Sequence, residues 1–318
     1  MATGRLRSVH RVQFSEGAGG ALPYAAFAAC SAVWGSTFLV ISIGNDSLPP
    51  VWAATIRLGL AAVILTVVAL VAGQKLPREA ALRAAALYGL FGFGVNFPIL
   101  YWGERTVPSG LTAVLYATIP LSTAFFARAF ALEALDGFKI GGAAVALGGV
   151  AVIFSSQAKG DIAIVPLGAL LVGASAASLA SVMLKLGPRQ PSLGANAVGA
   201  AVGFVICLAV SLGAREPWVI PRTIGQLFPI LYLTLAGSVG AYVLMAWLVN
   251  RWEVTRISFI AVIIPAIGLV LGWLVRHERL EPVSAIGAVL VICGVLLALQ
   301  ADRRRKKSQP QESHPRPA

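Results

Sequence analysis

The chain has few charged side chains. Only 12% of its 318 residues are Asp, Glu, Lys or Arg, and 58% are hydrophobic, whereas a soluble domain carries about 25% charged residues. The polar surface that remains is too small to cover a water-soluble globule. The composition therefore excludes an ordinary soluble protein and predicts a membrane protein that crosses the bilayer several times.

Motifs for catalysis and metal binding are also scarce. The three cysteines, Cys30, Cys207 and Cys293, lie in apolar runs without a CxxC spacing, so we expect core residues rather than disulfides or metal ligands. The three histidines have no catalytic neighbour in sequence, and GxSxG and HExxH motifs are missing. We therefore expect no enzymatic activity, no cofactor and no metal. A membrane-embedded lipid-modifying enzyme and a non-transporting membrane sensor remain the weaker alternatives.

Long apolar runs occupy most of the chain. Ten of them reach or approach the length of a membrane helix, roughly 20 residues, and short polar segments separate them. Their ranges are 22–44, 51–72, 81–103, 110–130, 138–155, 166–186, 194–213, 226–249, 256–276 and 282–300. The pattern predicts an all-α integral membrane protein with ten transmembrane helices.

The distribution of basic residues indicates an orientation. With the N-terminus placed in the cytoplasm, eighteen Lys and Arg residues fall on the cytoplasmic side and six on the outer side. This bias predicts a multi-pass protein of the inner (plasma) membrane with both termini cytoplasmic. We expect no nucleic-acid partner, because no basic patch interleaved with aromatic residues accompanies the net charge of +12. The lipid bilayer and a small-molecule substrate are the expected partners.

One pattern of residues occurs twice, 145 residues apart. It consists of Pro120, Glu133, Gly142 and Gly149 in the first copy, and of Pro265, Glu278, Gly287 and Gly294 in the second. Two related halves with five spans each must enter the membrane from opposite sides, which predicts inverted repeats related by an axis in the membrane plane. The predicted divisions are a cytoplasmic N-terminal tail (1–21), a first five-helix repeat (22–155), a second five-helix repeat (166–300) and a disordered basic cytoplasmic tail (301–318).

Three features together resemble a known family. They are the run Trp34–Phe38 (Trp-Gly-Ser-Thr-Phe), Arg57, and the duplicated Pro…Glu…Gly…Gly block. The chain resembles the EamA-type ten-helix members of the drug/metabolite transporter superfamily over about residues 22–300. The resemblance implies two inverted five-helix repeats around a central cavity. It also implies a secondary transporter that exports amino acids or related small metabolites by alternating access. Export of drugs, organic cations or nucleobases is the alternative. One departure is that Ser175–Ser178, without tryptophan, stands at the corresponding place in span six.

Arg57 is the most informative single residue for a binding site. It lies about 10 Å inside the second span at 1.5 Å per residue. An ionisable side chain at that depth is costly and indicates a function, here a clamp for a substrate carboxylate or phosphate. The alternatives are that Arg57 extends to the outer headgroups or bonds to backbone carbonyls. Both interpretations stay open.

Aromatic and polar residues predict the lining of the cavity. Trp34, Tyr116 and Tyr242 lie too deep for an interfacial aromatic belt, and their donors need partners there. The predicted substrate-binding residues are Trp34, Thr37, Arg57, Asn96, Tyr101, Tyr116, Tyr242 and Trp247. Pro120 and Pro265 lie inside spans and are predicted hinges, with a static bend as the alternative.

Acidic and small residues complete the pattern. No carboxylate lies in the middle of a span, and Glu104 comes nearest, where we expect it to pair with Arg105 or to face solvent. We expect Glu133 and Glu278 to stabilise the corners at which a new helix begins. Small residues spaced by four, such as Gly268 and Gly272, are typical of close helix packing. They are compatible with a homodimer, although packing within one chain is the commoner explanation.

Overall fold

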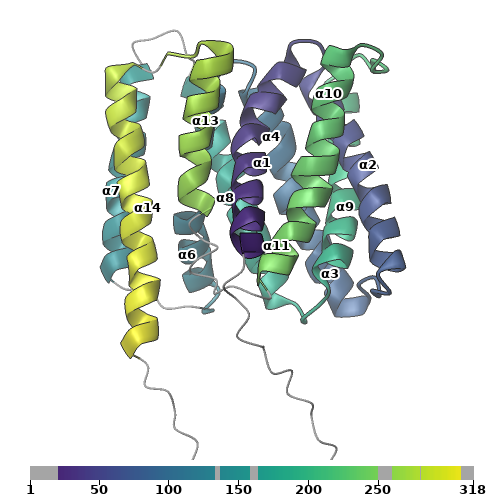
Figure 1. The fold of residues 1–318 in the computed structure, drawn as a ribbon, viewed down its shortest axis with the longest axis horizontal. Helices are drawn as coiled ribbons and strands as arrows, with labels where there is room; N and C mark the ends of the chain where they lie inside the picture. Colours follow the sequence, from purple (N-terminus) through teal and green to yellow (C-terminus); the bar gives the residue numbers. More distant parts are fainter. Residues whose placement is uncertain (1–20, 133–136, 158–163, 250–259, 280, 309–318) are drawn as a thin grey trace, which may run out of the picture.

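The computed structural model describes residues 21–132, 137–157, 164–249, 260–279 and 281–308. All regular elements in these ranges are helices (Figure 1). They are α1 (Ala21–Asn45), α2 (Pro50–Val71), α3 (Glu79–Gly89), η1 (Leu90–Val95), α4 (Asn96–Gly103), α5 (Ser109–Tyr116), α6 (Ile119–Ala129), α7 (Gly137–Gln157), α8 (Ile164–Leu186), α9 (Ser192–Gly213), α10 (Ile224–Tyr232), η2 (Leu233–Gly240), α11 (Ala241–Val249), α13 (Ile260–Arg276) and α14 (Pro282–Ser308). We call the end with the connections 46–49, 104–108 and 277–279 the upper end, as it is drawn in Figure 1.

Each of the ten predicted spans contains a helix, but not all of these helices are equally long. Seven helical passes in the described ranges are long and apolar enough to cross a membrane. Three further apolar stretches, Ile140–Ser155, Ile263–Arg276 and Pro282–Ala298, are shorter. α14 continues to Ser308 and so includes the first basic residues of the predicted tail. The corner residue Glu133, residues 1–20 and residues 309–318 lie outside the described ranges.

Two passes contain a π-helical segment that the sequence analysis did not predict. In η1 the Asn96 N–H reaches back five residues to the Phe91 carbonyl, and in η2 the Ala241 N–H reaches the Ala236 carbonyl. Such segments widen the helix and often mark functional sites. Pro98 contributes to the first, because it has no N–H to bond the carbonyl of Gly94, four residues earlier.

The glycines of the duplicated pattern form the contact between α7 and α14, which lie side by side on the left of Figure 1. A Cβ on Gly142 would lie 2.5 Å from the Gly294 carbonyl oxygen, and one on Gly149 would lie 2.6 Å from that of Gly287. The first glycine of each copy therefore meets the second glycine of the other copy. This reciprocal, antiparallel pairing is the pattern that a two-fold relation produces.

Other small residues bring the central helices together. Gly35 in α1 packs against Ile267 in α13, and Gly268 in α13 packs against Ala113 in α5. A Cβ added to either glycine would collide with the facing side chain. Gly268, one of the residues considered for a homodimer contact, thus packs within the chain. These contacts hold α1, α5 and α13 side by side, next to the residues around Arg57.

Candidate functional site

Arg57 turns into the helix bundle rather than toward the headgroups. Its side chain is buried, with 4% of its surface exposed. Its Nε donates to Ser238 Oγ at 3.2 Å, and its Nη1 donates to the Tyr101 hydroxyl at 3.2 Å. The guanidinium carbon lies 4.9 Å from the centre of the Phe97 ring, in cation–π range. Residues from α2, α4 and η2 therefore fix its position.

The charge of Arg57 has no carboxylate partner within the described part of the chain. A buried cation without a counter-ion is costly, so the site favours an incoming anion. Nε and Nη1 are used by the hydrogen bonds to Ser238 and Tyr101, so Nη2 is the third nitrogen of the guanidinium. Gly237 lies beside it, and a Cβ there would be 3.3 Å from Nη2. A side chain at this position would therefore contact Nη2.

A small pocket reaches Arg57 from the upper half of the bundle. Arg57 and Tyr101 are its polar lining residues. The remaining lining is apolar and comes from Ile41, Gly44, Leu48, Ala53, Pro229, Ile230 and Leu233. Arg57 and Tyr101 are the residues of this pocket with groups suited to an anion, but their polar atoms present no accessible surface to it in this conformation.

The run Trp34–Phe38 of α1 lies against η2. Trp34 Nε1 donates to the Gly237 carbonyl at 3.3 Å. In a regular helix the Ala241 N–H would occupy that carbonyl, but in η2 it bonds to Ala236 instead. The π segment therefore releases the acceptor that Trp34 uses. Thr37 Oγ1, which donates to the Val33 carbonyl, would lie 3.8 Å from a Cβ on Gly237.

The same device occurs at Gly92, 145 residues before Gly237. Because the Asn96 N–H bonds to Phe91 and Phe93, the Gly92 carbonyl lacks its usual donor. It accepts the side-chain amide of Asn96 at 3.1 Å, and Asn96 Oδ1 accepts the Tyr116 hydroxyl at 2.6 Å. Asn96 and Tyr116 thus contact each other, next to the Arg57 group rather than in it.

Aromatic rings connect the predicted residues. Phe93 lies 5.3 Å from Phe97 between ring centres, and Phe97 lies 6.1 Å from Tyr101. Tyr242 packs edge-on against Trp34 at 6.2 Å and against Phe93 at 6.3 Å. Phe93 and Phe97 were absent from the predicted lining, although their four-residue spacing with Tyr101 places all three on one face of a helix. That spacing is the signal that could have found them.

Trp247 packs against a second cluster of buried residues, whose members include Cys30, Leu248 and Ile260. The structure therefore brings Trp34, Thr37, Arg57, Tyr101 and Tyr242 around η2 and keeps Asn96 and Tyr116 as an adjoining pair. Trp247 lies at the Cys30 cluster, which Trp34 also borders.

The two predicted hinge prolines differ in their surroundings. Pro120 is the second residue of α6, and a turn at Ala117 and Thr118 separates α6 from α5. Ser178 Oγ in α8 donates to the Ile119 carbonyl at 3.0 Å. Pro265 is buried inside α13, which continues through it. The fourth predicted span is therefore interrupted, whereas α13 is continuous.

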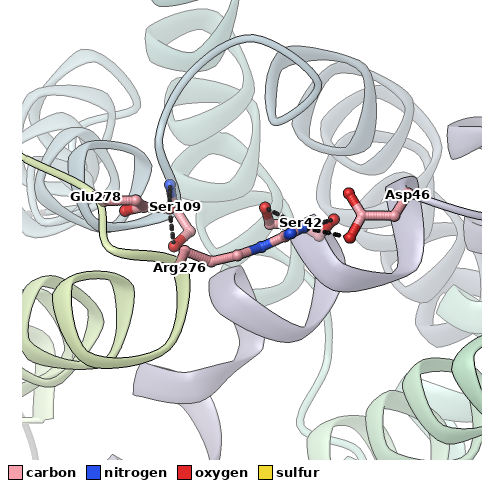
Figure 2. A network of polar contacts seen from close by, with 5 residues as sticks. All are labelled: Ser42, Asp46, Ser109, Arg276 and Glu278. Atoms are coloured by element: carbon pink, nitrogen blue, oxygen red, sulfur yellow. Dashed lines mark hydrogen bonds and ion pairs between the residues drawn. The ribbon is translucent and has the colours of Figure 1, made fainter.

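A polar network ties α13 to α1 and α5 at the upper end (Figure 2). Arg276 Nη2 donates to the Ser42 carbonyl at 2.8 Å and forms an ion pair with Asp46 at 2.8 Å. The Glu278 carboxylate accepts the Ser109 N–H at 2.9 Å, the Ser109 hydroxyl at 2.8 Å and the Gly110 N–H at 3.0 Å. Glu278 therefore caps the N-terminus of α5, a helix of the other repeat.

Glu104 lies at the same end, and the expectation for it was wrong. It is buried, with 4% of its surface exposed, and neither carboxylate oxygen has a hydrogen-bond partner among the described residues. Arg105 is exposed and forms no ion pair with it there. Burial, and then the negative charge of Glu278, raise the pKa of Glu104 well above its usual range.

Several known proteins similar to this chain are named as transporters, exporters or efflux pumps. A probable terminal-alkyne amino-acid exporter of Streptantibioticus cattleyicolor is 28% identical over 87% of this chain and 94% of that protein. A probable amino-acid metabolite efflux pump of Escherichia coli K12 is 25% identical over 86% and 93%. The uncharacterized inner membrane transporter YedA of the same strain is 37% identical, but the match spans only 44% of this chain and 45% of YedA.

A solved structure and a family model also match this chain. A solved structure described only as the crystal structure of a protein matches 90% of this chain and 99% of its own chain, with a TM-score of 0.59 and 18% identity, which shows a common fold alone. The model of the EamA-like transporter family matches residues 22–155 and 164–300. The resemblance found in the sequence is confirmed: the chain is a multi-pass membrane protein and belongs to the EamA-like transporter family.

Proposed function

We propose that this chain is a secondary transporter that exports amino acids or related small metabolites carrying a carboxylate. The observation that carries the proposal is the buried Arg57, which has no acidic partner among the described residues and lines a small apolar pocket. The names of two relatives, an amino-acid exporter and an amino-acid metabolite efflux pump, support this substrate class. The buried positive charge argues against organic cations, because like charges repel in a medium of low dielectric.

The geometry around Arg57 suits recognition of a carboxylate. Nη2 would donate a charge-assisted hydrogen bond to the solute, and such bonds are about twice as strong as neutral ones. Tyr101 keeps the guanidinium in place through Nη1, so binding requires little reorganisation. The rings of Trp34 and Tyr242, packed edge to face, do not line the small pocket and would contact the rest of the solute only in a state with a wider cavity.

The proposed layout is ten spans in two inverted five-helix repeats, with both termini in the cytoplasm and the upper end outside. The reciprocal contact between Gly142 and Gly294 supports it, as does the presence of η1 and η2 in equivalent passes. The two π segments even release carbonyls at equivalent glycines, Gly92 and Gly237. The bias of basic residues supports the orientation.

Alternating access would use the predicted hinges. The turn at Ala117 and Thr118, just before Pro120, supports motion of α6 against α5. Pro120→Ala restores an amide donor and so favours a continuous helix across this turn. We expect slower solute exchange at unchanged affinity. If the exchange rate of Pro120→Ala equals that of the unaltered protein, Pro120 forms a static bend and not a hinge.

A liposome assay tests the function. Purified protein is reconstituted with a panel of unlabelled amino acids inside, and exchange for labelled amino acids is measured. We expect Arg57→Ala to lower the affinity for solutes with a carboxylate on the order of 30-fold or more. This corresponds to ~2 kcal/mol or more, as for the loss of one partner of a buried charge pair. Arg57→Lys should restore only part of the lost affinity, because the lysine ammonium lacks the planar set of donors of a guanidinium.

Two controls make the assay specific. Arg105→Ala removes an exposed arginine and should leave exchange unchanged. Amide analogues of the exchanged amino acids lack the carboxylate, so Arg57→Ala should remove the preference for acid over amide. If Arg57→Ala keeps both its exchange rate and this preference, the clamp does not exist.

A further inference from the structure

Glu104 stands apart from the other buried or capping carboxylates of the upper end. Glu216 accepts the Val51 N–H at 3.1 Å, the Trp52 N–H at 2.8 Å and the Ser211 hydroxyl at 2.8 Å. Glu278 also accepts three donors, from Ser109 and Gly110. Glu104 accepts none within the described residues, although it is as deeply buried as Arg57.

Three physical effects act on Glu104 in the same direction. Burial without a donor disfavours the charged carboxylate. The negative charge of Glu278 repels a second negative charge. Glu104 also directly follows the last residue of α4, where the helix dipole disfavours an anion. A neutral carboxylic acid is therefore the form that this environment accommodates.

The titratable groups facing Glu104 come from three elements. Tyr101 in α4, Tyr116 in α5 and Glu278 after α13 interact with it electrostatically. α8 also packs here, through Leu170 against Gly103, but its one charged residue lies at the far end of that helix. Of the arginines at the upper end, Arg276 is paired with Asp46, and the others are exposed at the surface (Arg105, Arg215, Arg222 and Arg279).

Glu104 is connected both to the solute site and to the closure of the upper end. Tyr101 interacts electrostatically with Glu104 and holds Arg57 by a hydrogen bond. Glu278, its other neighbour, joins the segment after α13 to the start of α5 (Figure 2). A change in the charge of Glu104 would thus act on both.

We propose that Glu104 is a proton-binding site through which pH controls opening of the upper end. With a proton on Glu104, the carboxylic acid stays buried and the network around Arg276 and Glu278 stays closed. When the upper end opens, water reaches Glu104, the O–H bond breaks and the proton passes to water, leaving a solvated carboxylate. The inference adds a regulated step to the proposed function and rests on it only for the effect on transport.

Direct titration tests the site without any solute. Purified protein in nanodiscs is titrated with base while infrared difference spectroscopy follows the carbonyl band of protonated carboxylic acids. We expect one band to persist above the ordinary carboxyl range and to be absent in Glu104→Gln, an isosteric neutral variant suited to the buried site. Glu281→Gln, at an exposed carboxylate of the same end, should leave the band in place. A band that is unchanged in Glu104→Gln would overturn the proposal.

A second titration uses the neighbouring charge. Glu278→Gln removes the repulsion, so the carbonyl band of Glu104 should disappear at a lower pH than in the unaltered protein. If the band does not shift, or if sodium in place of choline removes it at constant pH, Glu104 is not a proton site of this kind. The sodium result would indicate a site for an inorganic cation.

The transport assay separates the two proposals. Exchange of labelled amino acids should vary with pH in the unaltered protein and be independent of pH in Glu104→Gln. A protein that exchanges no amino acid at any pH but still shows the infrared band contradicts the proposed function and not the proton site. Exchange that keeps its pH dependence in Glu104→Gln contradicts the proton site and not the proposed function.

Discussion

The indole N–H of Trp34 donates to the carbonyl of Gly237, a group that a regular helix would keep for its own backbone. The equivalent carbonyl of the first repeat, Gly92, accepts the side chain of Asn96. In both repeats a π segment converts a backbone acceptor into a part of the candidate site. The two halves thus share a backbone device and differ in the side chain that uses it.

Trp34→Phe removes the donor and leaves the Gly237 carbonyl without its partner. We expect a loss of about 1–3 kcal/mol of stability, because an unsatisfied buried acceptor costs about that much. Thermal unfolding in detergent measures it, and Trp273→Phe, at an exposed tryptophan of α13, is the matched control. Equal melting temperatures for the two variants would mean that the bond at 3.3 Å contributes nothing.

Gly237→Ala tests access to Arg57. The new Cβ would lie 3.3 Å from Nη2, where we place the solute carboxylate. We expect solute affinity to fall roughly tenfold, the lower range for a methyl-sized change in a binding pocket. Gly225→Ala adds the same group in α10, where nothing lies within 4 Å, and should leave affinity unaltered. Competition by unlabelled amino acids in the liposome assay gives both values.

Gly149→Ala tests the contact between α7 and α14. Its Cβ would lie 2.6 Å from the Gly287 carbonyl oxygen, a backbone atom that cannot move by a side-chain rotation. We expect destabilisation of about 1–3 kcal/mol from overpacking. The neighbouring Gly148 has nothing within 4 Å of a Cβ, so Gly148→Ala should not lower the melting temperature. A lower melting temperature in both variants would point to a general intolerance of α7 to substitution.

The raised pKa of Glu104 predicts how stability depends on pH. Because the carboxyl holds its proton more tightly in the folded protein than in the unfolded chain, its contribution is full below the unfolded pKa. That contribution is lost as pH rises through the folded pKa, since the folded protein must then bury a charge. We expect the melting temperature to fall over this window, and the fall to be smaller in Glu104→Gln. If the melting temperature falls equally in the unaltered protein and in Glu104→Gln, other titrating groups cause the fall.

The sequence predicts the glycine contact between α7 and α14 better than it predicts the surroundings of Arg57 and Glu104. Gly142 and Gly294 were found by pattern alone, because close packing requires glycine and each copy keeps it. The π segments could not be found in this way, since helical periodicity describes side chains and not which carbonyl an N–H reaches. Glu104 was misjudged for a related reason. Its neighbour in sequence is Arg105, but its neighbour in space is Glu278, which tertiary folding alone brings near.

The reciprocal glycine contact also bears on how such a chain can arise. The surface of α7 that carries Gly142 and Gly149 meets a surface carrying the same two glycines in the other copy, in antiparallel order. A surface of that kind is complementary to itself. Under the proposed inverted layout, two identical five-helix chains inserted in opposite orientations would pair through it before any gene fusion. The joint between the halves is therefore the kind of contact that a homodimeric ancestor would already possess.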